Sequence, residues 1–134
     1  SGYSKITDVI SYAEPTSGGG LFIMDSPGYD PVSVTGQIAS GATIVCFTTG
    51  RGSAIGFKPS PCIKISSNSN VYNSMMGDID FNCGPILNRS DSISNLGSQL
   101  FELIIETASG RQTLSELEDY GYNEFSPWQL GPVM

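Results

Sequence analysis

Residues 42–53 read Ala-Thr-Ile-Val-Cys-Phe-Thr-Thr-Gly-Arg-Gly-Ser, and this stretch carries the clearest fold signal in the chain. Its first half is apolar and β-branched, which predicts a buried strand over residues 42–47. A strand that is apolar throughout, instead of alternating with polar residues, is typical of a parallel sheet covered on both faces. The second half is polar and glycine-rich, which predicts a loop at the carboxyl end of that strand.

Strand and helix signals alternate on both sides of this stretch. Apolar runs predict further strands over residues 21–24, 62–65 and 79–81. Helical spacing and capping residues predict helices over residues 5–13, 32–40 and 70–76, a longer one from Asp91 or Ser92 to Gly110, and a short one that opens with the capping box Thr113-Leu-Ser-Glu. This order predicts an α/β fold: a Rossmann-like, mainly parallel sheet of about four strands, covered by helices on both faces. We expect residues 1–134 to form a single domain.

The composition excludes several classes of function. Thirteen acidic and six basic residues give a net charge of −7, which argues against binding to nucleic acid or to an anionic membrane. No apolar run approaches the roughly 18 residues of a membrane helix. The absence of histidine excludes a Ser-His-Asp triad, a Cys-His dyad and a histidine-based zinc site within this chain. Only 14% of the residues are charged, which suggests that part of the surface is normally covered.

The three cysteines, Cys46, Cys62 and Cys83, are an odd number in apolar or strand-like contexts. That pattern favours reduced, buried thiols over a disulfide framework. With no signal-peptide pattern at the first residues, it leads us to expect a cytoplasmic protein.

The carboxyl ends of the predicted strands hold the candidate site, because ligands bind there in parallel α/β sheets. In residues 48–53 the glycines can present backbone N–H groups, Arg51 offers a planar fork for a carboxylate, and the hydroxyls can bind sugar or acid oxygens. The alternative is a glycine-rich turn with an exposed arginine. Asp25 follows a strand, and Asp30 is expected to be a helix N-cap. Lys64, within an apolar strand, needs an acid or a substrate anion as partner.

Segments along nearly the whole chain resemble the carboxyl-terminal part of the altronate dehydratase and galactarate dehydratase family, with the altronate branch most similar and the large subunit of sulfolactate sulfo-lyase also similar. The quoted segments are Met24-Asp-Ser-Pro-Gly-Tyr-Asp-Pro-Val-Ser-Val-Thr-Gly36, Phe47-Thr-Thr-Gly-Arg-Gly-Ser53, Lys58-Pro-Ser-Pro61, Ile63-Lys-Ile65 with Asn68, Asp78-Ile-Asp-Phe-Asn-Cys-Gly84, Ala108-Ser-Gly110, Ser115-Glu-Leu117, Asn123-Glu-Phe125 and Pro127-Trp-Gln129.

The resemblance implies a hydro-lyase that dehydrates a sugar acid, altronate, to a 2-keto-3-deoxy acid with help from a divalent metal, Fe(II) or Mn(II). It implies amino-terminal and middle domains of the same enzyme, which would supply most of the metal ligands. It also leaves open that the enzyme is a homodimer. Elimination next to a carboxylate needs positive charge near the dianionic intermediate. Lys58 or Lys64 could stabilise this enediolate, or act as base if desolvation lowers the lysine pKa.

The remaining expected roles are substrate binding and metal binding. Asp25 and Asp30 are candidate contributors to the metal site. The residues expected to bind substrate are Thr48, Thr49, Gly50, Arg51, Gly52, Ser53 and Asn68.

Two alternatives from other classes stay open. The chain could be a non-catalytic domain that supports folding or dimerisation of such an enzyme, with residues 48–53 only a structural turn. It could also be a module that binds small anions.

Overall fold

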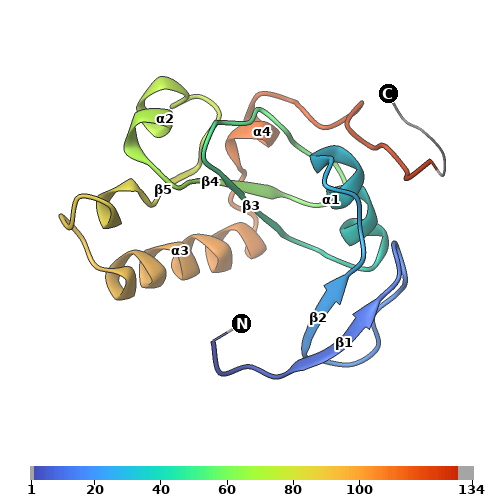
Figure 1. Ribbon diagram of the computed structural model, residues 1–134. Helices are drawn as coiled ribbons and strands as arrows, with labels where there is room; N and C mark the ends of the chain where they lie inside the picture. Colours follow the sequence, from blue (N-terminus) through green and yellow to red (C-terminus); the bar gives the residue numbers. More distant parts are fainter. Residues whose placement is uncertain (1, 130–134) are drawn as a thin grey trace. The chain divides into compact units, whose positions relative to one another are not determined.

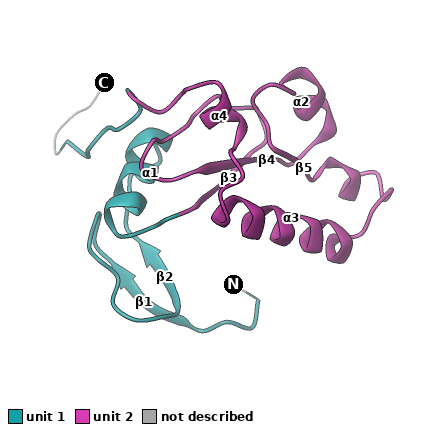
Figure 2. Cartoon of the chain, turned by 180° about the vertical axis from the view of Figure 1, so that it is seen from behind, with its two compact units in different colours: residues 1–43, 123–134 teal, residues 44–122 magenta. Residues whose placement is uncertain are grey.

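The computed structural model describes residues 2–129, which form five strands, four α-helices and one short 3₁₀ helix (Figure 1). The chain divides into two compact units (Figure 2). Unit 1 consists of residues 1–43 and 123–134, and unit 2 of residues 44–122. Each unit contains its own parallel sheet. The predicted α/β class with parallel strands is therefore confirmed, with the strands divided between two sheets.

Unit 1 contains a two-stranded parallel sheet and one helix. Strand β1 (Ile6–Ile10) pairs with β2 (Leu21–Met24), and helix α1 (Asp30–Ala39) follows. The ring of Tyr12 packs so closely on α1 that a Cβ at Gly36 would lie 2.3 Å from it. The Tyr12 hydroxyl donates to the carbonyl of Val32 at 2.8 Å, which fixes this packing.

The helix predicted over residues 5–13 is wrong, because the chain forms strand β1 there. Four of the five residues of β1 are β-branched, a composition that favours extended backbone and restricts the side chain in a helix. Pairing with β2 satisfies the backbone groups of the strand, so the tertiary contact prevails over the helical spacing.

The expected N-cap at Asp30 is also corrected. Tyr29 occupies the cap position and Asp30 is the first residue of α1. No side chain caps this end of the helix. An acid in the first turn still interacts favourably with the helix dipole, which is a sufficient structural role for Asp30.

Unit 2 contains a three-stranded parallel sheet in the order β3 (Val45–Thr49), β4 (Cys62–Ser66), β5 (Phe81–Asn82). Every residue of the central strand β4 is buried. In the register of the sheet, Phe47 pairs with Lys64 and Thr49 with Ser66. The predicted strands lie within a few residues of the observed ones.

The helices of unit 2 lie on two sides of its strands (Figure 1), with α3 on one side and α2 and α4 on the other. The Ser92 hydroxyl caps α3, and Thr113 and Glu116 form the predicted capping box of α4. Helix α2 is Ser69–Ser74, the 3₁₀ helix η1 is Gly84–Ile86, α3 is Ile93–Ala108 and α4 is Leu114–Leu117.

A buried charged pair lies inside unit 2. The side chains of Lys64 and Asp80 are 1% and 8% exposed, and their charged atoms, Nζ and Oδ2, are 4.0 Å apart. Asp80 also accepts hydrogen bonds from the backbone N–H of Lys64 at 2.7 Å and from that of Leu114 at 2.8 Å. The acid predicted as one possible partner for Lys64 is therefore Asp80, and this carboxylate joins the sheet to α4.

The three cysteines are free, as predicted, but only Cys62 is buried. Burial raises the pKa of the Cys62 thiol to about 12, so this thiol stays protonated near neutral pH. Cys46 is exposed, which corrects the expectation that all three are buried. Within the part of the chain that the structure describes, we find no helix with the length and apolar character needed to span a membrane.

We predict that Asp80→Asn lowers the free energy of unfolding by about 3 kcal/mol, because it leaves the Lys64 ammonium buried without a counter-charge. Asp119→Asn is the matched control, since Asp119 pairs with Lys58 at the surface and exposed pairs contribute little. Urea unfolding followed by circular dichroism measures both. Equal, small losses for the two variants would contradict a central role for the buried pair.

Candidate functional site

The loop that leaves β3 has a fixed backbone. The Thr49 hydroxyl accepts hydrogen bonds from the backbone N–H of Arg51 at 3.3 Å and from that of Gly52 at 3.0 Å. Gly52 has a φ of +99°, and a Cβ there would lie 2.1 Å from the sulfur of Met75. Both the left-handed conformation and the close approach of Met75 require glycine at this position.

Asn68 holds the start of the loop against the beginning of α2. Its Nδ2 donates to the Gly50 carbonyl at 3.1 Å, and its Oδ1 accepts from the backbone N–H of Val71 at 2.9 Å as the N-cap of α2. The Ser66 hydroxyl donates to the Asn68 carbonyl at 2.7 Å. Residues at the ends of β3 and β4 therefore lock the loop to the sheet.

The far end of the loop is held by the buried pair. The Ser53 hydroxyl accepts from the backbone N–H of Ile55 at 3.2 Å. The carbonyl of Ile55 accepts a hydrogen bond from Lys64 Nζ, also at 3.2 Å. Hydrogen bonds from Thr49 and Asn68 at one end and from Lys64 at the other thus fix residues 50–55.

Arg51 projects from this fixed loop into solvent. Its side chain is exposed, and among residues 2–129 its guanidinium takes part in no hydrogen bond or ion pair. Thr48 is also exposed, whereas the hydroxyls of Thr49 and Ser53 are occupied by loop N–H groups. A free guanidinium on a rigid backbone is suited to bidentate binding of a carboxylate.

Lys58 lies outside this arrangement and is held as a cation. It forms an ion pair with Asp119, and its Nζ lies 4.4 Å from the centre of the Tyr122 ring. The hydrogen bond to Asp119 raises the pKa of Lys58. A proton acceptor needs the opposite shift, so these contacts favour a role for Lys58 as a fixed positive charge.

The carboxylates of the described chain do not form a metal site. Among residues 2–129 no three His, Cys, Asp or Glu side chains gather where they could hold a metal ion. Asp25 and Asp30 are exposed in unit 1, and Arg51 belongs to unit 2. Residues 2–129 therefore do not by themselves supply the three ligands of a metal centre.

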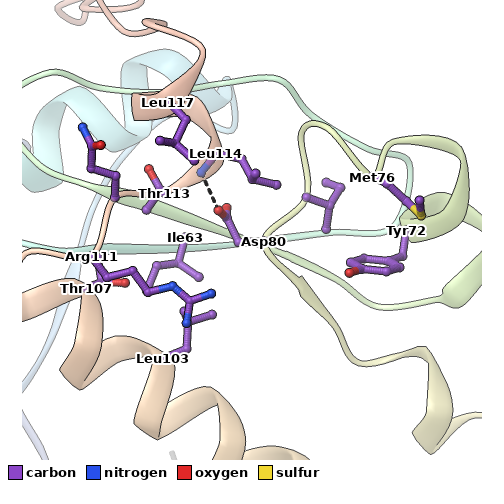
Figure 3. A pocket seen from close by; sticks show the side chains of 12 residues that line it. Ile63, Tyr72, Met76, Asp80, Leu103, Thr107, Arg111, Thr113, Leu114 and Leu117 are labelled. Atoms are coloured by element: carbon purple, nitrogen blue, oxygen red, sulfur yellow. Dashed lines mark hydrogen bonds between the residues drawn. The ribbon is translucent and has the colours of Figure 1, made fainter.

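A pocket of about 300 Å³ lies elsewhere in unit 2, next to Asp80 (Figure 3). Side chains from α2, α3, α4 and β4 line it, and most of them are apolar. Its two charged groups have partners: Asp80 accepts from the Leu114 N–H, drawn as the dashed line, and Arg111 pairs with Glu106. The pocket does not include the loop that carries Arg51.

The structure brings together the predicted substrate-binding residues that follow β3 and β4, namely Thr49, Gly50, Arg51, Gly52, Ser53 and Asn68. Lys64 reaches this group only through Ile55, and Lys58 pairs elsewhere with Asp119. Asp25, which the sequence also places at the carboxyl end of a strand, belongs to unit 1, and its part in the site stays a prediction.

Sequence reasoning missed that Asp80 holds Lys64 and that Asp119 holds Lys58. Asp80 directly precedes strand β5, and an acid near that strand is a possible partner for Lys64. The sequence does not show which of the nearby acids is the partner. Asp119 is distant in sequence from Lys58 and gave no signal.

We predict that Gly52→Ala lowers the free energy of unfolding by about 1–2 kcal/mol, because alanine is strained in a left-handed conformation. The new methyl group would also displace Met75. Gly77→Ala is the control, since nothing lies within 4 Å of a Cβ there and its φ is ordinary. Equal unfolding midpoints in urea for the two variants would show that the loop does not need this backbone conformation.

Comparison with known proteins gives one consistent family. The family model described as D-galactarate/altronate dehydratase, C-terminal, matches residues 1–133. Galactarate dehydratase (L-threo-forming) of Escherichia coli K12 is 32% identical over 133 residues, which is 99% of this chain and 25% of that protein. The (2R)-sulfolactate sulfo-lyase subunit beta of Chromohalobacter salexigens is 35% identical over 121 residues, 90% of this chain and 31% of that subunit.

Altronate dehydratase of Bacillus subtilis strain 168 is 33% identical over 119 residues, which is 89% of this chain and 24% of that protein. The chain thus spans between about a quarter and a third of the length of these curated relatives. The family match covers nearly every residue, including the loop after β3 and the strands that hold it. The chain belongs to the D-galactarate/altronate dehydratase carboxyl-terminal family.

Proposed function

We propose that this chain is the carboxyl-terminal, substrate-binding part of a longer hydro-lyase that removes water from a sugar acid. The observation that carries the proposal is the free guanidinium of Arg51 on a loop fixed at both ends. The family match and the dehydratase names of the relatives support the reaction class. Altronate is the substrate we propose, with galactarate as the alternative.

The proposed role of Arg51 is to bind the substrate carboxylate in bidentate fashion, while Thr48 binds a substrate hydroxyl. Removing a proton next to a carboxylate builds a second negative charge, so positive charge must be held close to it. Arg51 supplies one such charge, while a role for Lys58, which Asp119 keeps as a cation outside this loop, stays a prediction. Lys64 acts through Ile55, by holding the loop in place.

The proton acceptor and a divalent metal, Fe(II) or Mn(II), would come mostly from the rest of the polypeptide, in the proposed amino-terminal and middle domains. Residues 2–129 contain no group of three ligands for the metal. Asp25 and Asp30 stay candidate contributors.

A sulfo-lyase is a second candidate, favoured by the 35% identity to a sulfolactate sulfo-lyase subunit. Sulfolactate is a 2-hydroxy acid too, so a carboxylate clamp serves either reaction. The two functions differ in the leaving group, which the clamp does not contact. Assay of the full-length polypeptide with altronate, galactarate and sulfolactate separates them.

We predict that Arg51→Ala lowers kcat/KM of the full-length enzyme at least about 100-fold, since a charged hydrogen bond to substrate is lost. Arg51→Lys restores only part of the activity, because an ammonium lacks the planar fork. Arg89→Ala, which removes an exposed arginine of the same unit, is the control and leaves turnover unchanged. Unchanged kcat/KM in Arg51→Ala would place the site elsewhere and favour a structural domain.

We further predict that the 134-residue chain alone does not dehydrate sugar acids. A carboxylate clamp without a placed proton acceptor binds the substrate but cannot remove the proton next to the carboxylate, so it gives little rate by itself. The measurement is formation of a 2-keto-3-deoxy acid by the purified chain with Fe(II) or Mn(II), against a control without protein. Metal-dependent product above that control would place the whole site within these residues.

A further inference from the structure

The hydroxyl of Ser67 lies beside the loop that carries Arg51. Ser67 directly follows β4, and its backbone N–H donates to the Thr49 carbonyl at 2.9 Å. Its side chain is exposed, and among residues 2–129 its hydroxyl takes part in no hydrogen bond. Unit 2 thus has a hydroxyl without a partner, on a fixed backbone, at the carboxyl end of its sheet, where parallel α/β sheets bind ligands.

Gly50 keeps this hydroxyl accessible. The φ of Gly50 lies outside the left-handed region, so its backbone conformation does not require glycine. Apart from its chain neighbours, the only heavy atom of the described structure within 4 Å of a Cβ built at Gly50 is Ser67 Oγ, at 3.3 Å. A methyl group there would crowd the hydroxyl, so glycine leaves space for a ligand beside it.

The register of the sheet places Ser67 and Thr48 on the same face. Thr49 pairs with Ser66, and this register, continued by one residue, sets Gly50 opposite Ser67, in agreement with the close approach of the two. Residues two apart in a strand share a face, so Thr48 lies on the same face as Gly50 and Ser67. Thr48 is exposed too, and its hydroxyl has no partner within residues 2–129.

The proposed substrates share one polar group beside the carboxylate. Altronate, galactarate and sulfolactate each have a hydroxyl on the carbon next to the carboxylate. A guanidinium has only donors, so Arg51 suits the carboxylate but cannot accept the proton of this hydroxyl. A serine hydroxyl both donates and accepts, and Ser67 lies opposite the residue that precedes Arg51.

We propose that Ser67 binds the substrate hydroxyl on the carbon next to the carboxylate, while Arg51 binds the carboxylate itself. This inference rests on the proposed function, which takes the loop after β3 as the substrate site. Thr48, on the same face, is then left for a hydroxyl further along the substrate. Ser67 thereby selects 2-hydroxy acids over acids that lack this hydroxyl, because the site offers the hydroxyl a partner.

The test compares Ser67→Ala with the wild type in the full-length enzyme. The two ligands are altronate, or galactarate where that is the acid turned over, and the matching 2-deoxy analogue. The analogue keeps the carboxylate but cannot give a 2-keto acid, so it is measured as a competitive inhibitor. We expect kcat/KM for the substrate to fall about 10-fold in Ser67→Ala, and the inhibition constant of the analogue to change less than about 2-fold.

Ser94→Ala is the matched control and changes neither value, since it removes an exposed hydroxyl of α3 that also has no partner within residues 2–129. Unchanged kcat/KM in Ser67→Ala would overturn the proposal. So would equal weakening of turnover and of inhibition by the analogue, because damage to the loop affects both ligands alike.

Arg51→Ala distinguishes this failure from failure of the proposed function. Lost activity in Arg51→Ala together with unchanged activity in Ser67→Ala contradicts only the role of Ser67. Unchanged activity in both variants contradicts the substrate site as a whole.

Discussion

The buried pair of Lys64 and Asp80 is the interaction on which the rest of unit 2 depends. An ammonium that is only 1% exposed needs a counter-charge and hydrogen-bond acceptors, and it has one carboxylate and one carbonyl. Through Asp80 the pair joins β4 to the start of α4, and through the Ile55 carbonyl it joins β4 to the loop that follows β3. These two charged side chains thereby hold three segments of the chain together.

The candidate site depends on this pair indirectly. The glycine-rich loop is fixed by Thr49 and Asn68 where it leaves the sheet, and by Lys64 where it turns back. Less backbone entropy is lost on binding when the loop is already fixed, so a rigid loop makes Arg51 a better clamp for a carboxylate. Lys64, which the sequence offers as a candidate catalytic base, is in our account a positioning residue.

Much of unit 2 could be predicted from the sequence, because its central strand β4 is mostly apolar and buried and its helices carry capping residues such as Ser92 and Thr113. Strand β1 was not predicted, since the spacing of Ile6, Val9 and Ile10 fits a helix although their β-branched side chains favour a strand, and the pairing with β2 decides. The loop at Arg51 was predictable from its residue types. The partners of Lys58 and Lys64 were not, because contacts across 61 or 16 residues leave no local pattern.

Residue-resolved amide hydrogen exchange in Lys64→Met tests this dependence most directly. Methionine keeps the length of the side chain and removes its charge, and Asp80 retains its two backbone donors. The account predicts that exchange at the amides of Gly52 and Ile55 speeds up at least about 10-fold more than exchange at the amides of β4. Unchanged exchange at Gly52 and Ile55 would contradict the claim that Lys64 holds the loop that carries Arg51.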